Sequence, residues 1–263
     1  MFAIGLTILL LFESFDAEEP GRLHERLERH ELLSIAEGEG VDGSNGLKAD
    51  YVGYDEGSRR IVLRDTLDKA MSEATLSYDV KFPEEFQFVR GGKLHGLGPE
   101  SPVSGGHDRE PHRWSARVTF SGDESVRTYV YDQTEGVTYG VGRSPDNGFT
   151  FSREQYHAVS MHMKLNDPDE ANGFVDIYVD GERVVSHDNL RIRGTGGEET
   201  LIQTLLFSTF HGGSGPSWAP VDEEGEYTTV HAFFDNFAVH EGEAIREAPL
   251  SLEQAAEKME ATR

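Results

Sequence analysis

Lys93 is the first residue of this sequence that could do chemistry. It lies in the segment "FVRGGKLHGLG", with glycines on both sides, in a chain that has only 6 lysines against 48 aspartate and glutamate residues. Glycines let a backbone approach a ligand closely, and a lysine among them could bind an anion. We therefore interpret Lys93 as part of a binding cleft rather than as a surface charge.

Two later segments, "WSARVTF" and "RTYVYDQ", carry polar side chains on one face of predicted strands. Successive side chains of a strand point to opposite faces. Ser115 and Arg117 therefore share one face of the first strand, and Tyr129 and Tyr131 share one face of the second. Arginine binds carboxylates and aromatic rings pack on sugars, but a solvent-facing sheet with aromatic cross-strand pairs explains the pattern equally well.

Four further residues are candidates for substrate binding. In "YHAVSMHMKL", His162 and Lys164 lie on the polar face of another predicted strand. Arg90 precedes Lys93 by three residues, and His211 stands beside two glycines in "FSTFHGG". We expect these side chains to contribute to the same cleft.

This set of side chains could support β-elimination at a uronic acid. A cation or strong hydrogen-bond donors must neutralise the C6 carboxylate, a base must remove the C5 proton, and an acid must protonate the departing O4. Arg117 and Lys93 suit the first task. Tyr129 and Tyr131 could supply the acid and the base if neighbouring cations lower the tyrosine pKa from its ordinary value of about 10.

The residues around these candidates alternate in the pattern of β-strands. Several short strand-like runs, with turn residues and no helices between them, predict an all-β fold, a β-sandwich of the jelly-roll type. Asp180-Gly181 lies between two such runs and predicts a hairpin. The predicted strands lie at residues 74–82, 112–120, 127–133, 156–165, 173–186, 201–210 and 227–240.

Short helices are predicted near both ends of the chain, within residues 18–36 and 251–262, where leucines or other helix formers stand among charges. We expect one jelly-roll domain at residues 51–245, preceded by an N-terminal extension (1–50) and followed by a C-terminal helix (246–263). The length suits a single β-sandwich with a sizeable core.

Residues 2–12 form an apolar run that is too short to span a bilayer. The run has the length of a signal-peptide core, without basic residues before it. An export signal, a buried segment and a wrongly assigned start are the alternatives. We expect a monomer outside the cell or at its surface, without stable membrane association.

The charge balance argues against nucleic-acid binding, which needs a basic face. The formal net charge is −24, and the cations are 18 arginines and 6 lysines. Such a composition is typical of proteins from high-salt environments, where screening weakens the repulsion between like charges. An ordinary acidic secreted protein is the alternative.

No metal or other cofactor is expected. The chain has no cysteines, which excludes disulfides and thiolate metal sites. The acidic segment "NDPDEANG" lacks the spacing of a helix–loop–helix calcium site, and His107 and His112 lack a third zinc ligand. No phosphate loop, dinucleotide fingerprint or nucleophile elbow is present.

Five blocks taken together resemble the alginate and glucuronan lyases of polysaccharide lyase families fourteen and twenty. The blocks are "FVRGGKLHGLG", "WSARVTF", "RTYVYDQ", "FSTFHGG" and "FFDNFAV", and they occur in the order of these families over residues 74–240. The resemblance implies a β-jelly roll, β-elimination on an acidic uronate polymer, and catalysis without a metal.

The resemblance also implies roles at the matching positions. Lys93 and Arg117 would bind and neutralise the substrate carboxylate, and Ser115 would position the substrate through a hydrogen bond. Tyr129 and Tyr131 would be the acid and the base, in an order left open. Lys93 could instead be the base if its pKa were depressed.

His95 stands where the family motif commonly has proline, which changes the stiffness of the predicted loop. We expect His95 to contact substrate, a solvated loop histidine being the alternative. The segment "ARVTFSGDES" also lacks the Trp-Arg pair that often follows in these families, which leaves the choice of substrate open.

Two other functions occur on similar folds. A carbohydrate-binding module would have no need for an acid/base pair. A glycoside hydrolase would need two carboxylates in the cleft, roughly 5–10 Å apart. The predicted set of lysine, arginine and tyrosine favours the lyase over both.

Overall fold

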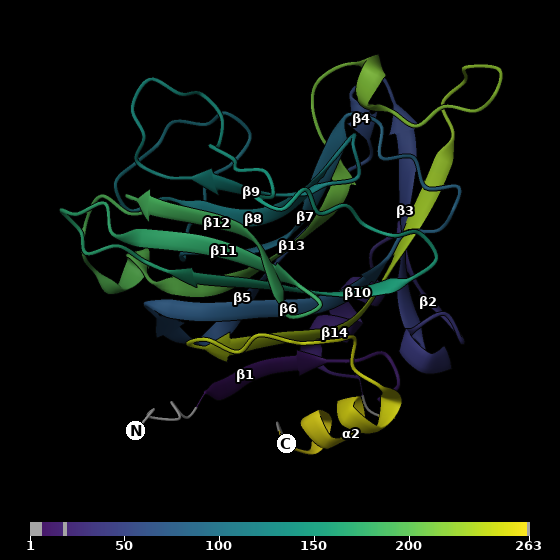
Figure 1. Ribbon diagram of the computed structural model, residues 1–263, viewed down its shortest axis with the longest axis horizontal. Coiled ribbons are helices and arrows are strands. Elements are labelled where there is room, and N and C mark those ends of the chain that lie inside the picture. The colour runs from purple at the N-terminus through teal and green to yellow at the C-terminus, as the bar shows by residue number, and fades with distance from the viewer. Residues whose placement is uncertain (1–6, 18–19, 262–263) are drawn as a thin grey trace.

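Alternating hydrophobic residues build two antiparallel sheets that pack face to face around one core (Figure 1). The computed structural model describes residues 7–17 and 20–261. The all-β sandwich predicted from the sequence is confirmed, because strands dominate the described residues and only two short α-helices occur.

The smaller sheet has the strand order β5-β13-β7-β8-β9. Its strands are β5 (Ile61–Met71), β7 (Gly91–Gly98), β8 (Ser115–Ser121), β9 (Val126–Tyr131) and β13 (Ile202–His211).

The larger sheet follows the order β12-β11-β10-β6-β14-β3-β2, with β1 paired to β14 and β4 paired to β3. Its strands are β1 (Ile8–Glu13), β2 (Leu33–Ala36), β3 (Gly46–Tyr54), β4 (Gly57–Ser58), β6 (Glu73–Lys81), β10 (Tyr156–Lys164), β11 (Gly173–Val179), β12 (Glu182–Leu190) and β14 (Thr229–Glu241).

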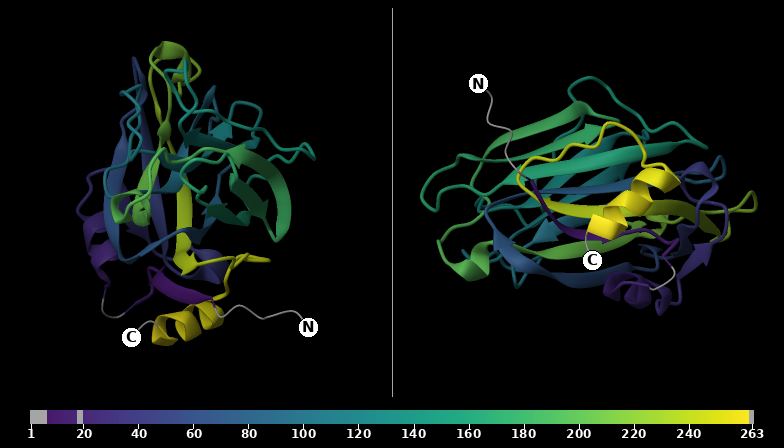
Figure 2. Two further views of the ribbon diagram at one scale, coloured as in Figure 1. Left: turned by 90° about the vertical axis from the view of Figure 1, so that its left-hand side faces the viewer. Right: turned by 90° about the horizontal axis from the view of Figure 1, so that it is seen from below.

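The α-helices are α1 (Arg22–Glu28) and α2 (Leu252–Ala261), and α2 lies beside β1 (Figure 2). The described residues also contain three 3-10 turns, η1 (Val41–Gly43), η2 (Glu198–Thr200) and η3 (Pro216–Trp218). None of the helices among residues 7–17 and 20–261 has the length and apolar character needed to cross a membrane.

The predicted hairpin at Asp180-Gly181 joins β11 to β12. Both turn residues have positive φ, 50° for Asp180 and 82° for Gly181. This conformation matches the right-handed twist of the flanking strands. The sequence pattern therefore located this turn correctly.

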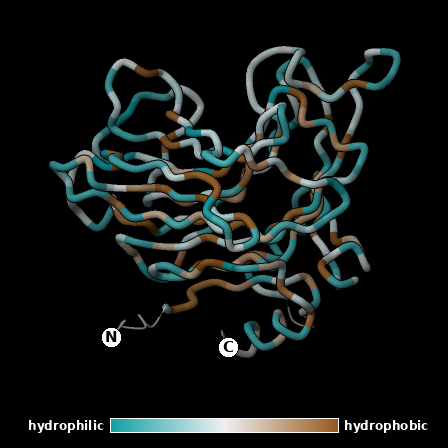
Figure 3. Tube along the Cα trace, viewed as in Figure 1, coloured by the Kyte–Doolittle hydropathy of each residue, from teal (hydrophilic) through white to brown (hydrophobic). Residues whose placement is uncertain are grey.

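The N-terminal residues are part of the larger sheet, in contrast to the expected extension over residues 1–50. Hydrophobic β1 (Figure 3) pairs with the C-terminal half of β14, while β3 pairs with the N-terminal half. The expected boundary at residue 50 falls inside β3. Residues 1–6, which include the first five residues of the apolar run, lie outside the described residues.

The helix expected within residues 18–36 is also shorter than predicted. It ends at Glu28, and β2 begins at Leu33. Arg22 and Arg26 attach α1 to Asp65 of β5 at 3.0 and 2.6 Å. The leucines that indicated one amphipathic helix thus serve a helix and a strand in turn.

A β-bulge in β7 places Lys93 and His95 on opposite faces of the smaller sheet. Lys93 pairs with Thr119 and Gly96 pairs with Arg117, so two residues of β7, Leu94 and His95, oppose one of β8. Both are fully buried. His95, which we expected to contact substrate from a loop, is thus part of a strand, and its side chain lies in the core.

A second bulge, in β14, receives the ring of His95. Asp235 pairs with Asp79 and Ala238 pairs with Ser77, so β14 also has one extra residue. Phe234 and Phe237 both enter the core, with ring centroids 4.8 and 4.9 Å from that of His95. Tyr78 and Phe207 complete the aromatic cage at 4.7 and 4.3 Å.

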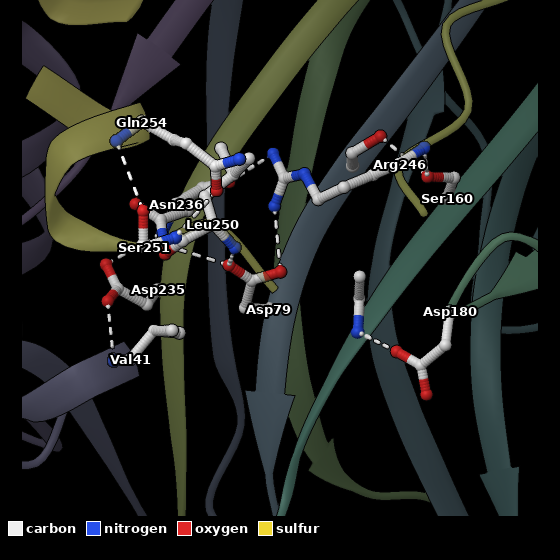
Figure 4. Close-up of polar contacts among 12 residues, drawn as sticks. Val41, Asp79, Ser160, Asp180, Asp235, Asn236, Arg246, Leu250, Ser251 and Gln254 are labelled. Carbon is white, nitrogen blue, oxygen red and sulfur yellow. Dashed lines mark hydrogen bonds and ion pairs between the residues drawn. The ribbon is translucent and has the colours of Figure 1, made fainter. Parts of the chain in front are cut away.

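The C-terminal segment after β14 crosses the outer face of the larger sheet and is held there by a buried ion pair (Figure 4). Arg246 donates to Asp79 at 2.9 Å and to the carbonyl of Asn236 at 2.8 Å. The Asn236 amide and the Leu250 N–H donate to the other Asp79 oxygen. Asp79 is fully buried, so the three donors from Arg246, Asn236 and Leu250 replace its hydration.

Replacing Asp79 by alanine is expected to destabilise the fold by about 3–5 kcal/mol, because Arg246 would keep a buried charge without a partner. Urea denaturation of Asp79→Ala measures this loss. The control is Arg183→Ala, which removes the ion pair of a half-exposed arginine with Asp176 and should cost at most about 1 kcal/mol. Equal losses in the two variants would contradict this account.

Replacing His95 by leucine should leave stability unchanged or raise it by about 1–3 kcal/mol, because both ring nitrogens are buried without a hydrogen-bond partner. Thermal and urea unfolding would show this. His211→Leu is the matched control, since Nε2 of this buried histidine lies 2.7 Å from the Gln87 carbonyl oxygen. A marked loss of stability in His95→Leu would show that its ring nitrogens have partners.

Candidate active site

A cleft of about 810 Å³ lies on the outer face of the smaller sheet. Its floor consists of residues from β7, β8, β9 and β13, which face away from the core. Loops rise on either side, one group after β7 and β9 and the other around η3 (Figure 1). The cleft is therefore built on a rigid sheet and bordered by loops.

Strand register brings the predicted catalytic side chains together. Arg117 pairs with Tyr129, and Ser115 pairs with Tyr131. Lys93 enters from β7, with its Nζ 3.2 Å from the centroid of the Tyr129 ring. All of these residues except Ser115 line the cleft.

Arg117 is held from below by Ser115. Its Nη1 donates to Ser115 Oγ at 2.7 Å, and that hydroxyl donates to the Val103 carbonyl at 2.7 Å. Ser115 is fully buried, so it positions the guanidinium rather than the substrate. This finding replaces the expectation that Ser115 itself binds substrate.

Gly96 makes room for Arg117 across the pair of strands. A Cβ at this position would lie 2.7 Å from the arginine Cγ and 2.1 Å from the Ala116 carbonyl oxygen. Any larger residue would displace the guanidinium from the cleft. This close approach explains why the third glycine of the "GGKLHGLG" block, Gly96, has no side chain.

Burial sets the ionisation of the cationic residues in the cleft. It lowers the pKa of Lys93 to about 7, helped by the positive charges of Arg117 and Arg60. Burial, together with nearby Arg64, lowers the pKa of Arg117 to about 10. At neutral pH Arg117 is thus a cation, while Lys93 is present in both protonation states.

The pKa of Tyr129 is raised, not lowered as we expected from its cationic neighbours. Burial is the main cause, and the Tyr131 hydroxyl adds to it. The opposing influence of Arg117 is smaller than the cost of placing a phenolate in this site. Tyr129 is therefore a neutral proton donor at physiological pH.

Tyr131 is fixed by the loop that follows β7. The Gly106 N–H donates to its hydroxyl at 3.0 Å, and the Arg109 guanidinium lies 5.4 Å from its ring centroid. Arg109 also donates to the carbonyls of Val137 and Tyr139 in the loop after β9. One arginine thus ties both loops together beside this tyrosine.

The cleft has no acidic lining, although the chain has 48 aspartate and glutamate residues. Five cations line it instead, and within the described part of the chain none of them forms an ion pair with a carboxylate. These cations are Arg60, Arg90, Lys93, Arg117 and Arg127. The site is thus prepared for an anionic ligand.

Two of the predicted binding residues belong to the other sheet. His162 and Lys164 lie on β10 and both contact Glu73, at 3.1 Å each. Alternation within one strand cannot indicate which sheet the strand joins, and this expectation is wrong for that reason. Among the remaining candidates, Arg90 lines the cleft.

His211 is buried beneath the cleft rather than exposed to it. Its ring packs against Phe86 with centroids 5.5 Å apart, and Nε2 bonds the Gln87 carbonyl. Its glycine neighbours Gly212 and Gly213 do line the cleft. The block "FSTFHGG" does lie at the cleft, but its glycines line the cleft and the predicted His211 does not.

Several residues of the cleft were missed as site residues, among them Arg60, His107, Arg127 and Trp218. Arg127 shares a face with the two tyrosines, so alternation could have found it. Arg60, His107 and Trp218 lie outside the strands, where no alternation of residues predicts the direction in which a side chain points. The described residues contain no group of three or more histidine and acidic side chains that could hold a metal ion.

Comparison with solved structures shows the same fold in several lyases. The alginate lyase from Aplysia kurodai is 21% identical, with a TM-score of 0.68, over 88% of this chain and 98% of its own. Alginate lyase Aly36B is 21% identical, with a TM-score of 0.64, over 79% and 83%. The endo-β-1,4-glucuronan lyase from Trichoderma reesei is 15% identical, with a TM-score of 0.54, over 81% and 89%.

A search of curated proteins finds no match to this sequence. The family model of polysaccharide lyase 14, in contrast, matches residues 55–237. This match runs through both sheets and includes every strand that lines the cleft. With most of its length matched, the chain belongs to polysaccharide lyase family 14.

Proposed function

We propose that this lyase cleaves a uronic-acid polymer by β-elimination. The observation that carries the proposal is the cleft with five cations and no carboxylate, in a chain of net charge −24. Cations without carboxylate partners attract an anion at short range despite the acidic surface. A polymer with a carboxylate on every sugar matches this arrangement.

Related structures support this class of substrate. They include alginate and glucuronan lyases. A variant of Aly36B with one lysine and one tyrosine replaced by alanine was solved in complex with an alginate tetrasaccharide. The same two residue types meet in the cleft described above, where Lys93 lies over the Tyr129 ring.

Arg117 is the residue that binds the C6 carboxylate in the proposed mechanism. It is charged at neutral pH, buried, and held by Ser115. Two parallel N–H groups can bind one carboxylate and stabilise the enolate that forms when the C5 proton leaves. This assignment agrees with the expectation from the sequence.

Lys93 is the proposed base and Tyr129 the proposed acid. A lysine with a pKa of about 7 is in part an uncharged amine at neutral pH, so it can take the C5 proton. The C4–O4 bond then breaks, a C4=C5 double bond forms, and the Tyr129 hydroxyl protonates O4. Since the Lys93 ammonium lies against the Tyr129 ring, it can return the proton to the phenolate.

The geometry favours Tyr129 over Tyr131 as the acid. Tyr131 is 1% exposed, and its oxygen already accepts the Gly106 N–H. Tyr129 is half-buried and lines the cleft. A glycoside hydrolase would need two carboxylates in this cleft, and a binding module would have no use for a lysine poised near neutrality.

We also propose an extracellular setting with high salt, on the basis of the polymeric substrate and the acidic composition. The Debye length falls to roughly 3 Å at 1 M salt, which screens the surface charge. The buried charge of Arg117 within the cleft is screened less. High salt should then favour both stability and access of the polyanion.

The proposed activity predicts an increase in ultraviolet absorbance, from the conjugated uronate product, on alginate or glucuronan at low and high salt. Tyr129→Phe should lower kcat by about 10²–10⁴-fold, and Tyr131→Phe by less. Tyr227→Phe is the control, since this exposed tyrosine lies outside the cleft. If no uronate polymer yields product, the lyase proposal fails.

The proposed base predicts that kcat/KM rises with pH through about 7 as Lys93 loses its proton. Below that pH the lysine is an ammonium and cannot accept the C5 proton. Lys93→Arg should abolish turnover while it retains the positive charge. A pH profile that is flat across neutrality, or an active Lys93→Arg variant, would remove Lys93 from the role of base.

A further inference from the structure

We propose that Trp218 and Arg90 form a distal subsite that binds a second uronate residue of the same polymer chain. The inference rests on the proposed function, because it places a further sugar of that substrate. Both residues line the cleft, and neither belongs to the catalytic group around Arg117. A ring that packs on a sugar face, beside a cation, is suited to a uronic acid.

Arg90 is oriented for this role by the indole ring. Its guanidinium carbon lies 5.1 Å from the Trp218 ring centroid, and Nη1 donates to Ser217 Oγ at 3.2 Å. Arg90 is exposed, and no described residue provides a carboxylate partner for it. Stacking on the indole leaves the edge of the guanidinium available to a ligand carboxylate.

The backbone around Trp218 is shaped for the indole. Gly213 has a φ of 99°, and a Cβ there would lie 2.3 Å from the indole ring. Only glycine therefore allows the indole to pack on this segment. Trp218 is the last residue of the single turn η3, and its side chain is half-buried at the cleft wall. A ring already ordered in this way loses little entropy on binding.

The subsite lies at a distance from the reacting bond. Arg90 lies in the turn before β7 and Lys93 is the third residue of that strand, which places their backbones roughly 7–10 Å apart at about 3.3 Å per extended residue. A sugar bound over the Lys93–Tyr129 pair leaves Arg90 and Trp218 to a neighbouring part of the polymer. The subsite thus favours longer chains over short oligomers.

Tryptophan fluorescence provides a direct binding test. The chain has two tryptophans; Trp114 is fully buried and donates to the Thr200 carbonyl, so a ligand in the cleft can reach only Trp218. Mannuronate and glucuronate tetrasaccharides are titrated into Lys93→Ala, which is expected to leave them intact. Emission should change with saturation, and the change should be absent with cellotetraose and in Lys93→Ala/Trp218→Phe.

Kinetics test the same subsite through chain length. Trp218→Phe and Arg90→Gln should each lower kcat/KM on the polymer by about tenfold, mainly through KM, and by less on the shortest oligomer cleaved. Arg59→Gln is the matched control, since it removes one positive charge from an exposed ion pair with Glu31, outside the cleft.

The outcomes separate the two proposals. Unchanged Trp218 emission with every uronate tetrasaccharide, or equal losses on short and long substrates, would overturn the subsite while leaving the lyase activity standing. An equal response to cellotetraose would also overturn it. A uronate-specific change in emission supports the subsite even if no polymer yields product, a result that would overturn the lyase proposal alone.

Discussion

The extra residue in β7 decides which side chains reach the cleft and which reach the core. Because Leu94 and His95 both point inward, Lys93 faces outward beside Tyr129 while His95 enters an aromatic cage. A regular strand would place Lys93 and His95 on the same face. The position of the proposed catalytic lysine and the packing between the sheets therefore depend on one irregularity of the backbone, which is matched by the bulge in β14 on the opposite sheet.

Desolvation then gives these side chains their chemical properties. The same burial that lowers the pKa of Lys93 raises that of Tyr129, so the lysine is in part an uncharged amine at neutral pH and the tyrosine stays a proton donor. No carboxylate stands nearby to neutralise the cations. The acidic composition of the chain is thus a property of its surface, and the cleft is an exception to it.

The strand pattern of the sequence was enough to predict the sandwich, the hairpin at Asp180-Gly181 and the shared faces of Arg117 and Tyr129. The pattern gave wrong predictions where the alternation of side chains along a strand was not sufficient. His95 required knowledge of a bulge, and His162 required knowledge of which sheet its strand joins. The direction of the Tyr129 pKa shift depends on burial, whereas the expectation from the sequence considered only the neighbouring cations. Trp218 comes from a loop, where direction is set by packing alone.

The position of β14 has a consequence for the order in which this fold can form. β14 is the last strand in sequence, yet it lies between β6 and β3 and pairs with both. Until the ribosome has released it, the two halves of the larger sheet have no common neighbour, and Asp79 lacks Asn236 and Arg246. The larger sheet can therefore close only after β14 has been synthesised, and the strand edges that stay unpaired until then favour aggregation of the incomplete chain.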